Sequence, residues 1–220
     1  MSSPALEPFD LVVFDWDGTL IDSTATIARA IQGAAADLGL PVPDFEAASH
    51  VIGLGLHDAL ARTVPDLPRE RVGEFVAQYR HHYLANEESL ELFAGVRDLL
   101  GWLGADKTLA IATGKSAAGL ARALQATQLG ALFAATRCAD QTAPKPHPAM
   151  LLELAAELGV DGARVLMIGD TTHDLQMAAA AGAGSVGVTY GAHSRVQLAA
   201  CEPLALVDSV AELARWMGRP

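Results

Sequence analysis

The feature that most constrains the fold is a set of short apolar runs that alternate with helical patterns. Continuous aliphatic runs bounded by glycine and polar residues are typical of parallel strands that are buried on both faces. The runs cover residues 11–15, 108–113, 165–169, 185–189 and 204–207, with a weaker run at 133–137. Because helical patterns separate them, the sequence predicts a doubly wound α/β fold with a Rossmann-like parallel sheet and right-handed crossovers.

The helical patterns in the same part of the chain have apolar residues three and four positions apart. They cover residues 96–103, 116–129, 148–158 and 174–181. Ser209 with Glu212 three positions later has the pattern of a capping box, which predicts the start of a last helix.

The segment between the first two apolar runs departs from this alternation and contains no convincing strand. Its helical stretches, which prolines separate, are 24–38, 56–63 and 69–84. We therefore expect a small helical domain at residues 21–92. It would be inserted into a discontinuous α/β core made of residues 1–20 and 93–220, and a chain of 220 residues is long enough for both.

The composition restricts the partners and the location of the chain. It has 26 Asp and Glu against 15 Lys and Arg, a formal net charge of −11, which disfavours nucleic acid. Charges interrupt every apolar stretch well before the roughly 20 residues that a bilayer span needs. We find no secretory signal in the first residues, so a cytoplasmic location is expected. Cys138 and Cys201 have no metal-ligand or redox spacing and are expected to be buried free thiols.

Two carboxylates follow the first apolar run, where Asp15-Trp16-Asp17-Gly18 leads into a turn. In an extended segment this spacing points both carboxylates to one side. Close carboxylates repel each other, which raises the pKa of one of them or requires a cation, and the pair can then serve as an anion and a proton donor. An aspartate-rich turn that caps a helix is the alternative explanation of this stretch.

Polar residues also follow later strands of the predicted sheet. Thr113 and Gly114 offer a hydroxyl and an unhindered backbone N–H, which suit a phosphoryl oxygen. Asp170 and Asp174 place two further carboxylates on the first turn of a helix, although capping explains one of them equally well. Because ligands of open α/β sheets bind outside the carboxyl ends of the strands, we expect Asp15, Thr113 and Asp170 to lie together.

Lysine is scarce in this chain, which has only Lys107, Lys115 and Lys145. Most lysines are solvated surface residues. Lys145, however, lies between Pro144 and Pro146, which stiffen its loop, and this favours a place at the predicted site. Lys115 is expected to be a surface residue or a helix cap.

The order of these residues resembles the four motifs of the haloacid dehalogenase (HAD) superfamily. The motifs are Asp15-x-Asp17-Gly-Thr, Thr113-Gly114, Lys145 and Gly169-Asp170-x-x-x-Asp174. The resemblance covers core residues from about 11 to 191, and four motifs in this order are highly specific. The insert after the first motif resembles the helical cap of the branch that contains phosphoglycolate phosphatases.

The resemblance implies a reaction through an aspartyl-phosphate. Asp15 would be the nucleophile, and Asp17 would protonate the leaving alkoxide and then accept a proton from water. Thr113, the Gly114 N–H and Lys145 would hold the phosphoryl oxygens. The expected function is a phosphatase that hydrolyses a phosphomonoester of a small metabolite, with phosphoglycolate as the first guess.

The resemblance also implies Mg²⁺ as the cofactor. The Asp15 carboxylate, the Asp17 backbone carbonyl and Asp170 would hold the ion, with Asp174 helping directly or through water, since hard oxygen ligands suit Mg²⁺. The expected partner is a small phosphorylated metabolite, with no nucleic acid and no membrane. The chain is expected to be a monomer or a homodimer.

Other functions of the same residues stay open. A phosphosugar mutase would pass the phosphoryl group to a sugar hydroxyl, and a pyrophosphatase of the superfamily would cleave a phosphoanhydride. A non-catalytic phosphate-dependent switch is a third alternative, but it needs neither Asp17 nor a cap. Asp17 argues against a haloacid dehalogenase, and the absence of lysine from residues 52–57 disfavours phosphonate cleavage.

Two features near the predicted site allow several interpretations. Residues 52–57 lie where this branch places its substrate-specificity loop, but their glycines also suit the ends of helices, and His57 has the pattern of a solvated helix residue. Trp16 could pack under the cap, narrow the leaving-group pocket or make only an apolar contact, and we favour the last.

Overall fold

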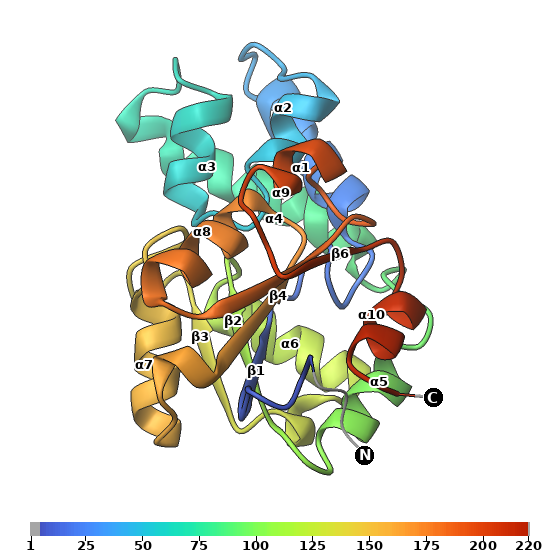
Figure 1. Ribbon diagram of the computed structural model, residues 1–220. Coiled ribbons are helices and arrows are strands. Elements are labelled where there is room, and N and C mark those ends of the chain that lie inside the picture. Colours follow the sequence, from blue (N-terminus) through green and yellow to red (C-terminus); the bar gives the residue numbers. More distant parts are fainter. Residues whose placement is uncertain (1–4, 220) are drawn as a thin grey trace.

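The core of the molecule is a single parallel β-sheet in the residues that the computed structural model describes, 5–219. The strand order is β3-β2-β1-β4-β5-β6 (Figure 1). The strands are β1 (Leu11–Phe14), β2 (Thr108–Thr113), β3 (Ala135–Cys138), β4 (Val165–Gly169), β5 (Gly184–Val188) and β6 (Ala205–Val207). The predicted doubly wound α/β fold is confirmed, since the chain runs outward from β1 in one direction and then from β4 in the other.

Helices cover both faces of this sheet. One apolar cluster joins the sheet to α5 (Val96–Leu103), α6 (Ala117–Thr127) and α10 (Val210–Trp216). A second cluster lies on the opposite face and joins the sheet to α7 (Ala149–Leu158) and α8 (Thr172–Ala181). The remaining elements of the core are α9 (Arg195–Ala199) and the short 3₁₀ helices η2 (Gly130–Leu132) and η3 (Gly162–Arg164).

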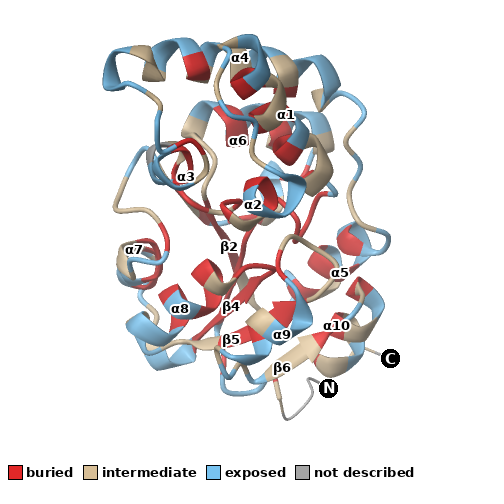
Figure 2. Cartoon of the chain, turned by 90° about the horizontal axis from the view of Figure 1, so that it is seen from above, coloured by how far each residue is buried: buried red, intermediate tan, exposed pale blue. Residues whose placement is uncertain are grey.

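Strand β1 lies at the centre, paired with β2 on one side and β4 on the other. Its alternate residues enter the two clusters: Val12 and Phe14 pack on the α5 side, and Leu11 and Val13 on the α7 side. All four residues are buried, which explains why the strand is a continuous apolar run in the sequence. Figure 2 shows the same burial for β2 and β4, with exposed residues on the outer turns of the surrounding helices.

The insert after β1 is helical. It contains α1 (Thr24–Asp37), α2 (Phe45–His50), α3 (Leu56–Thr63), the 3₁₀ helix η1 (Arg69–Arg71) and α4 (Val72–Glu87). These helices enclose an apolar cluster of their own and lie beyond the carboxyl ends of the strands (Figure 1). Of the helices in the described residues, none is long and apolar enough to cross a membrane.

The chain enters and leaves the insert along two segments that lie side by side. Ile21 and Leu92 form an antiparallel bridge. The Asp22 N–H donates to the Glu91 carbonyl at 2.9 Å, and the Phe93 N–H donates to the Leu20 carbonyl at 3.1 Å. The insert is therefore attached to the core by a paired connection, while its treatment as a separate domain of residues 21–92 stays a prediction.

Several local details differ from the sequence predictions. Helices α2 and α9 were not predicted, because each is so short that it presents no helical period of its own. The side chain of Ser209 accepts from the Glu212 N–H, but the Glu212 carboxylate accepts from Asp208 instead, so only half of the expected capping box forms. Cys138 is buried, as predicted, whereas Cys201 is only half-buried, so the prediction of two buried thiols was wrong for Cys201.

Candidate active site

Asp15 lies at the carboxyl end of the central strand and is fully buried. Its backbone N–H donates to the Ile168 carbonyl of β4 at 2.9 Å, which continues the sheet pairing one residue beyond β1. Its Oδ1 accepts from the Trp16 N–H at 2.6 Å, while Oδ2 is buried and has no hydrogen-bond partner. Burial raises the pKa of Asp15 well above its usual range, Lys145 opposes this effect, and the neighbouring Asp174 and Asp170 add to it.

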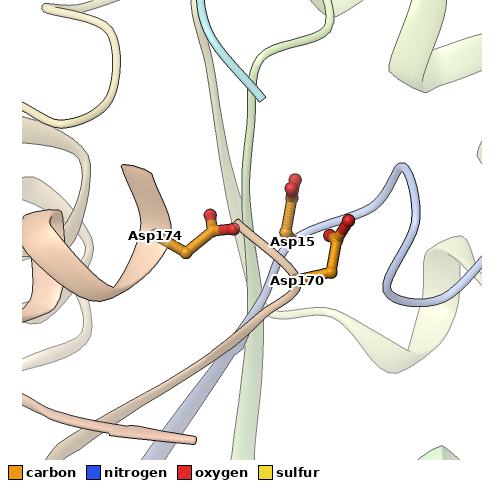
Figure 3. A group of neighbouring side chains, drawn as sticks. All are labelled: Asp15, Asp170 and Asp174. Atoms are coloured by element: carbon orange, nitrogen blue, oxygen red, sulfur yellow. The ribbon is translucent and has the colours of Figure 1, made fainter. Parts of the chain in front are cut away.

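Asp170 and Asp174 complete a buried group of carboxylates with Asp15. One oxygen from each residue lies within 4.8 Å of the other two, and Figure 3 shows the Asp15 side chain between the other two. Asp170 follows β4 and accepts from the Thr19 hydroxyl and the Ala192 N–H, each at 2.7 Å. Burial, and then the charge of Asp174, raise the pKa of Asp170 to about 7.

Asp174 is held by the first turn of α8. Thr171 and Asp174 form a capping box, in which the Asp174 Oδ2 accepts from the backbone N–H of Thr171 at 3.1 Å and from its hydroxyl at 2.7 Å. The other carboxylate oxygen, Oδ1, lies 2.6 Å from Lys145 Nζ. The capping interpretation of Asp174 is therefore confirmed, while its other carboxylate oxygen belongs to the buried group and its role in the chemistry stays a prediction.

The backbone around Asp170 is packed so closely that side chains are excluded. A Cβ at Gly18, where φ is +77°, would lie 2.2 Å from Asp170 Oδ2, and a Cβ at Gly191 would lie equally close to the same oxygen. Two glycines from opposite ends of the core thus allow the turn after β1 and the loop after β5 to enclose this carboxylate.

Lys145 is the cation at the centre of this group and is fully buried. Its Nζ lies 2.9 Å from Asp15 Oδ1 and 2.6 Å from Asp174 Oδ1. Burial alone would lower the pKa of Lys145, but the two carboxylates raise it above its usual range, so the side chain stays charged.

The donor set of this group fits a divalent cation. Three buried carboxylates face a single lysine, which leaves excess negative charge inside the protein. Oxygen ligands of this kind suit Mg²⁺ or a similar hard ion. The Asp17 carboxylate does not belong to the group, so only its backbone carbonyl is compatible with the role predicted for it in metal binding.

The Asp17 side chain faces a different environment, in which two donors hold it. Ser23 donates its hydroxyl to Asp17 Oδ1 at 2.7 Å, and Lys115 Nζ lies 3.2 Å from the same oxygen. Ser23 stands at the N-cap of α1 but does not cap that helix with its side chain. The hydroxyl that would ordinarily stabilise the helix end instead positions Asp17.

The prediction for Lys115 was wrong, since it is neither a surface residue nor a helix cap. Its side chain is only 9% exposed. Besides the pair with Asp17, Nζ donates to the Tyr83 hydroxyl at 2.8 Å and lies 4.6 Å from the centre of the Tyr83 ring. Tyr83 belongs to α4 of the insert, so this lysine connects the core to the cap, and only the scarcity of lysine could have signalled it.

Thr113 and Gly114 lie where the sequence predicted, at the carboxyl end of β2. Thr113 is buried, and its hydroxyl accepts from the Lys115 N–H at 3.2 Å. A Cβ at Gly114 would lie 2.6 Å from the Gly53 carbonyl oxygen, so the loop between α2 and α3 rests directly on this turn. A Cβ on Gly53 itself would come within 3.8 Å of Asp15 Oδ2.

Two histidines of the core hold the same part of the cap. The Nε2 atoms of His173 and His193 lie 3.1 and 3.0 Å from the His50 carbonyl oxygen at the end of α2. His193 Nδ1 accepts from the Thr172 N–H, so its proton is on Nε2 and points to that carbonyl. Burial lowers the pKa of His173 to about 4, which keeps this contact neutral.

A cavity of about 420 Å³ lies between the insert and the core. Asp15 and Asp17 line it together with Gly114, Lys115 and the first turn of α6. The insert contributes α1, the loop between α2 and α3, and the inner residues of α3 and α4. The carboxylates that follow β1 are thus accessible from a space that the cap covers.

Comparison with known proteins identifies the family. A protein-family model described as "Haloacid dehalogenase-like hydrolase" matches residues 12–188. The chain belongs to this family. It is 43% identical over 213 residues to the "Probable phosphatase IndB" of Dickeya dadantii, covering 92% of this chain and 91% of that protein. It is 33% identical to the "Phosphoglycolate phosphatase" of Yersinia pestis, covering 95% and 93%.

Solved structures show the same architecture for this HAD-like hydrolase. The crystal structure of a predicted phosphoglycolate phosphatase from Haemophilus somnus matches with a TM-score of 0.82 at 27% identity, covering 94% of this chain and 97% of that one. A hydrolase from Pseudomonas syringae matches with a TM-score of 0.86 at 22% identity, covering 94% and 96%, which shows the fold alone. The resemblance inferred from the four motifs is thereby confirmed.

Trp16 and the loop at 52–57 have different places in the HAD-like hydrolase. Trp16 is fully buried in the apolar cluster on the α5 side of the sheet and does not line the cavity, which confirms the apolar contact that we favoured. Residues 52–54 line the cavity next to Asp15. The side chain of His57 lies outside the described residues.

Proposed function

We propose that this HAD-like hydrolase is a Mg²⁺-dependent phosphatase that hydrolyses phosphomonoesters of small metabolites through a phosphoaspartyl intermediate on Asp15. The observation that carries the proposal is the Oδ2 of Asp15, which is buried without a partner, two residues before a carboxylate that faces the same cavity. A nucleophile and a proton donor on one side of an extended segment are what displacement at phosphorus requires.

In the first step the Oδ2 of Asp15 attacks phosphorus, and the bond between phosphorus and the ester oxygen breaks. Asp17 donates its proton to the leaving alkoxide, which departs as an alcohol. In the second step water attacks the phosphoaspartyl group and gives a proton to Asp17, so that phosphate leaves and both aspartates return to their starting state. Ser23 and Lys115 support this role, because they fix the Asp17 carboxylate over the cavity.

Thr113, the Gly114 N–H and Lys145 would hold the oxygens of the transferred phosphoryl group, where the reaction depends on position and charge. Lys145 is 2.9 Å from Asp15, so it lies beside the phosphoryl group as soon as that group is on the aspartate. Mg²⁺ would be held by Asp15, the Asp17 carbonyl, Asp170 and Asp174, and would supply charge that stabilises the phosphoryl oxygens. Residues 21–92 would form the cap domain over this site.

The substrate is the open part of the proposal. "Phosphoglycolate phosphatase" is the name of several relatives that are 32–35% identical, which supports phosphoglycolate as the first substrate to test. The apolar walls of the cavity also bear on this choice.

The test is phosphate release from a panel of phosphomonoesters, with EDTA and with added Mg²⁺, combined with trapping of labelled phosphate on Asp15. We expect Mg²⁺-dependent release, and label on the parent chain but not on Asp15→Asn. Isomerised sugar phosphate would instead indicate a mutase, and activity confined to pyrophosphate would indicate a pyrophosphatase. A stable phosphoaspartate without release would indicate a switch.

A further inference from the structure

The part of the cavity that the insert lines has mainly apolar walls. We propose that it binds the leaving group of the substrate and selects an uncharged, ring-sized alcohol over a two-carbon hydroxy acid such as glycolate. This inference rests on the proposed phosphatase activity and adds the class of ester on which the enzyme acts.

The size of the cavity is the first argument. Its volume of about 420 Å³ lies in the range of pockets that enclose drug-sized ligands, roughly 300–1,000 Å³. A phosphoryl group with glycolate is much smaller than a drug-sized ligand. An ester that fills this space would expel water from around Asp15 and Asp17, whereas phosphoglycolate would leave much of that water in place.

The chemistry of the walls is the second argument. Ile27 and Ile31 of α1 are buried, and they line the cavity with Leu54 and Leu56 from the loop and helix that follow α2. On α4, Tyr79 and Tyr83 have ring centres 6.1 Å apart and planes inclined by 24°. Such a surface gains from contact with an apolar ring and gives a small polar group few partners.

The charges around the cavity are the third argument. A carboxylate on the leaving group would need a cation, but Lys115 already pairs with Asp17, and Arg122 lies 3.3 Å from a Glu87 carboxylate oxygen. Arg80 is exposed, where water screens its charge. Among the described residues that line this part of the cavity, no buried cation is left for a carboxylate. An uncharged leaving group avoids placing a further anion near Asp17.

The experiment compares four esters of primary alcohols: phosphoglycolate, ethyl phosphate, benzyl phosphate and cyclohexylmethyl phosphate. Because all four have alkoxide leaving groups, differences in kcat/KM report mainly on how the leaving group is bound. We expect both ring esters to exceed ethyl phosphate and phosphoglycolate by about tenfold or more, the usual effect of filling an apolar pocket. Equal values, or a preference for phosphoglycolate, would overturn the inference.

A pair of variants tests the location of the binding site. Leu56→Trp fills the cavity and should reduce the ratio of kcat/KM for cyclohexylmethyl phosphate to that for ethyl phosphate by about tenfold. Val72→Trp is the matched control, because Val72 is half-buried in the same insert but does not line the cavity, and its ratio should be that of the parent. Thermal unfolding should first show that Leu56→Trp is folded. If the folded variant keeps the parent ratio of kcat/KM for the two esters, the assignment of the leaving group to this cavity is contradicted.

The two proposals fail in different ways. If the chain releases phosphate from ethyl phosphate or phosphoglycolate with Mg²⁺ but gains nothing from a ring, the phosphatase proposal stands and the inference on the leaving group is wrong. If none of the four esters releases phosphate and no label is trapped on Asp15, the proposed function itself is wrong.

Discussion

The two ends of the cavity differ in how they are built. At the sheet edge, Asp15 lines the cavity and belongs to a fully buried polar group, in which Asp15 and Asp174 contact Lys145 and Asp170 lies close to both carboxylates. At the other end, the walls come from four elements of the insert and are mainly aliphatic and aromatic. If the proposed function holds, the reaction and the choice of substrate depend on separate parts of the chain, which can be altered independently.

Lys115 contacts residues at both ends of the cavity, so the two ends are not fully independent. Its Nζ contacts Asp17 of the core and Tyr83 of the insert. A closed cap therefore adds a hydrogen bond to the lysine that faces the proposed proton donor. The predictions that follow test each end and then this connection.

The largest effect is expected at the nucleophile. Asp15→Asn removes the carboxylate oxygen that attacks phosphorus while it preserves shape, so turnover should fall by about 10⁴-fold or more. Phosphate release under saturating Mg²⁺ measures this. Asp22→Asn, a change of the same chemistry at an exposed position, should retain parent activity. Substantial release by folded Asp15→Asn would reject the role of Asp15.

The next largest effect is expected on the free energy of unfolding, through the buried group that contains Asp15 and Lys145. Lys145→Met leaves the buried carboxylates without their cation and should cost about 3–5 kcal/mol in the free energy of unfolding, as measured in urea at pH 8. Lys107→Met is the control, because Lys107 makes one hydrogen bond, to the Phe9 carbonyl, and its loss should cost about 1 kcal/mol. Equal losses in the two variants would show that the buried group does not depend on Lys145.

A smaller effect is expected where the two ends meet. Lys115→Met removes one of the two donors that hold the Asp17 side chain in position, and should slow the hydrolysis of alkyl phosphates, which need a correctly placed proton donor, by roughly 10²-fold. 4-Nitrophenyl phosphate, whose leaving group needs little protonation, should be affected less in its first step. Tyr83→Phe removes only the hydrogen bond to Lys115 and should have a smaller effect than Lys115→Met. Identical losses for both kinds of ester would show that Lys115 does not act through Asp17.

The smallest effect is a pH dependence of stability in the metal-free protein. Burial raises the pKa of Asp170 to about 7 in the folded state, against 3.8 for the ordinary group. Between these values the folded protein binds a proton that the unfolded chain has lost, so stability falls as the pH rises from about 4 to about 7. Asp170 should therefore lower the midpoint of thermal unfolding in EDTA at pH 8 relative to pH 5, whereas His173, whose pKa burial lowers to about 4, acts in the opposite direction.

Two control variants identify the group that is responsible for this slope of stability against pH. Asp170→Asn should flatten it, while Asp106→Asn, at an exposed position, should leave it unchanged. Mg²⁺ should raise the midpoint more at pH 8 than at pH 5, because metal binding requires deprotonated carboxylates. A slope that persists unaltered in Asp170→Asn would assign it to other groups.

The sequence predicted the core closely because each core strand carries its own signal. Residues 165–169 form a strand with the predicted bounds, since an aliphatic run buried on both faces has few other solutions. The insert was less predictable. Helix α2 is six residues long and lies beyond two prolines, and its packing against α1 stabilises it more than any local pattern does.

The candidate site also contains residues that the sequence could predict and residues that it could not. Asp15, Thr113, Lys145 and Asp170 could be found from the sequence, because parallel strands bring their carboxyl ends to one edge whatever the loops do. Ser23 and Lys115 could not. An N-cap serine and a lysine just before a helix have ordinary local explanations, and only the tertiary structure shows that both side chains contact Asp17.

The sequence by itself determined the α/β core, the family and the four motifs, because these depend on short-range patterns and on the order of the strands. The tertiary structure decided how Asp15 and Asp174 share one lysine, how Lys115 connects the core to the cap, and how large the cavity is and how apolar the walls from the insert are. These properties arise between residues that are far apart in the chain, such as Asp17 and Lys115 or Gly53 and Gly114, and no local pattern encodes a distance across that separation.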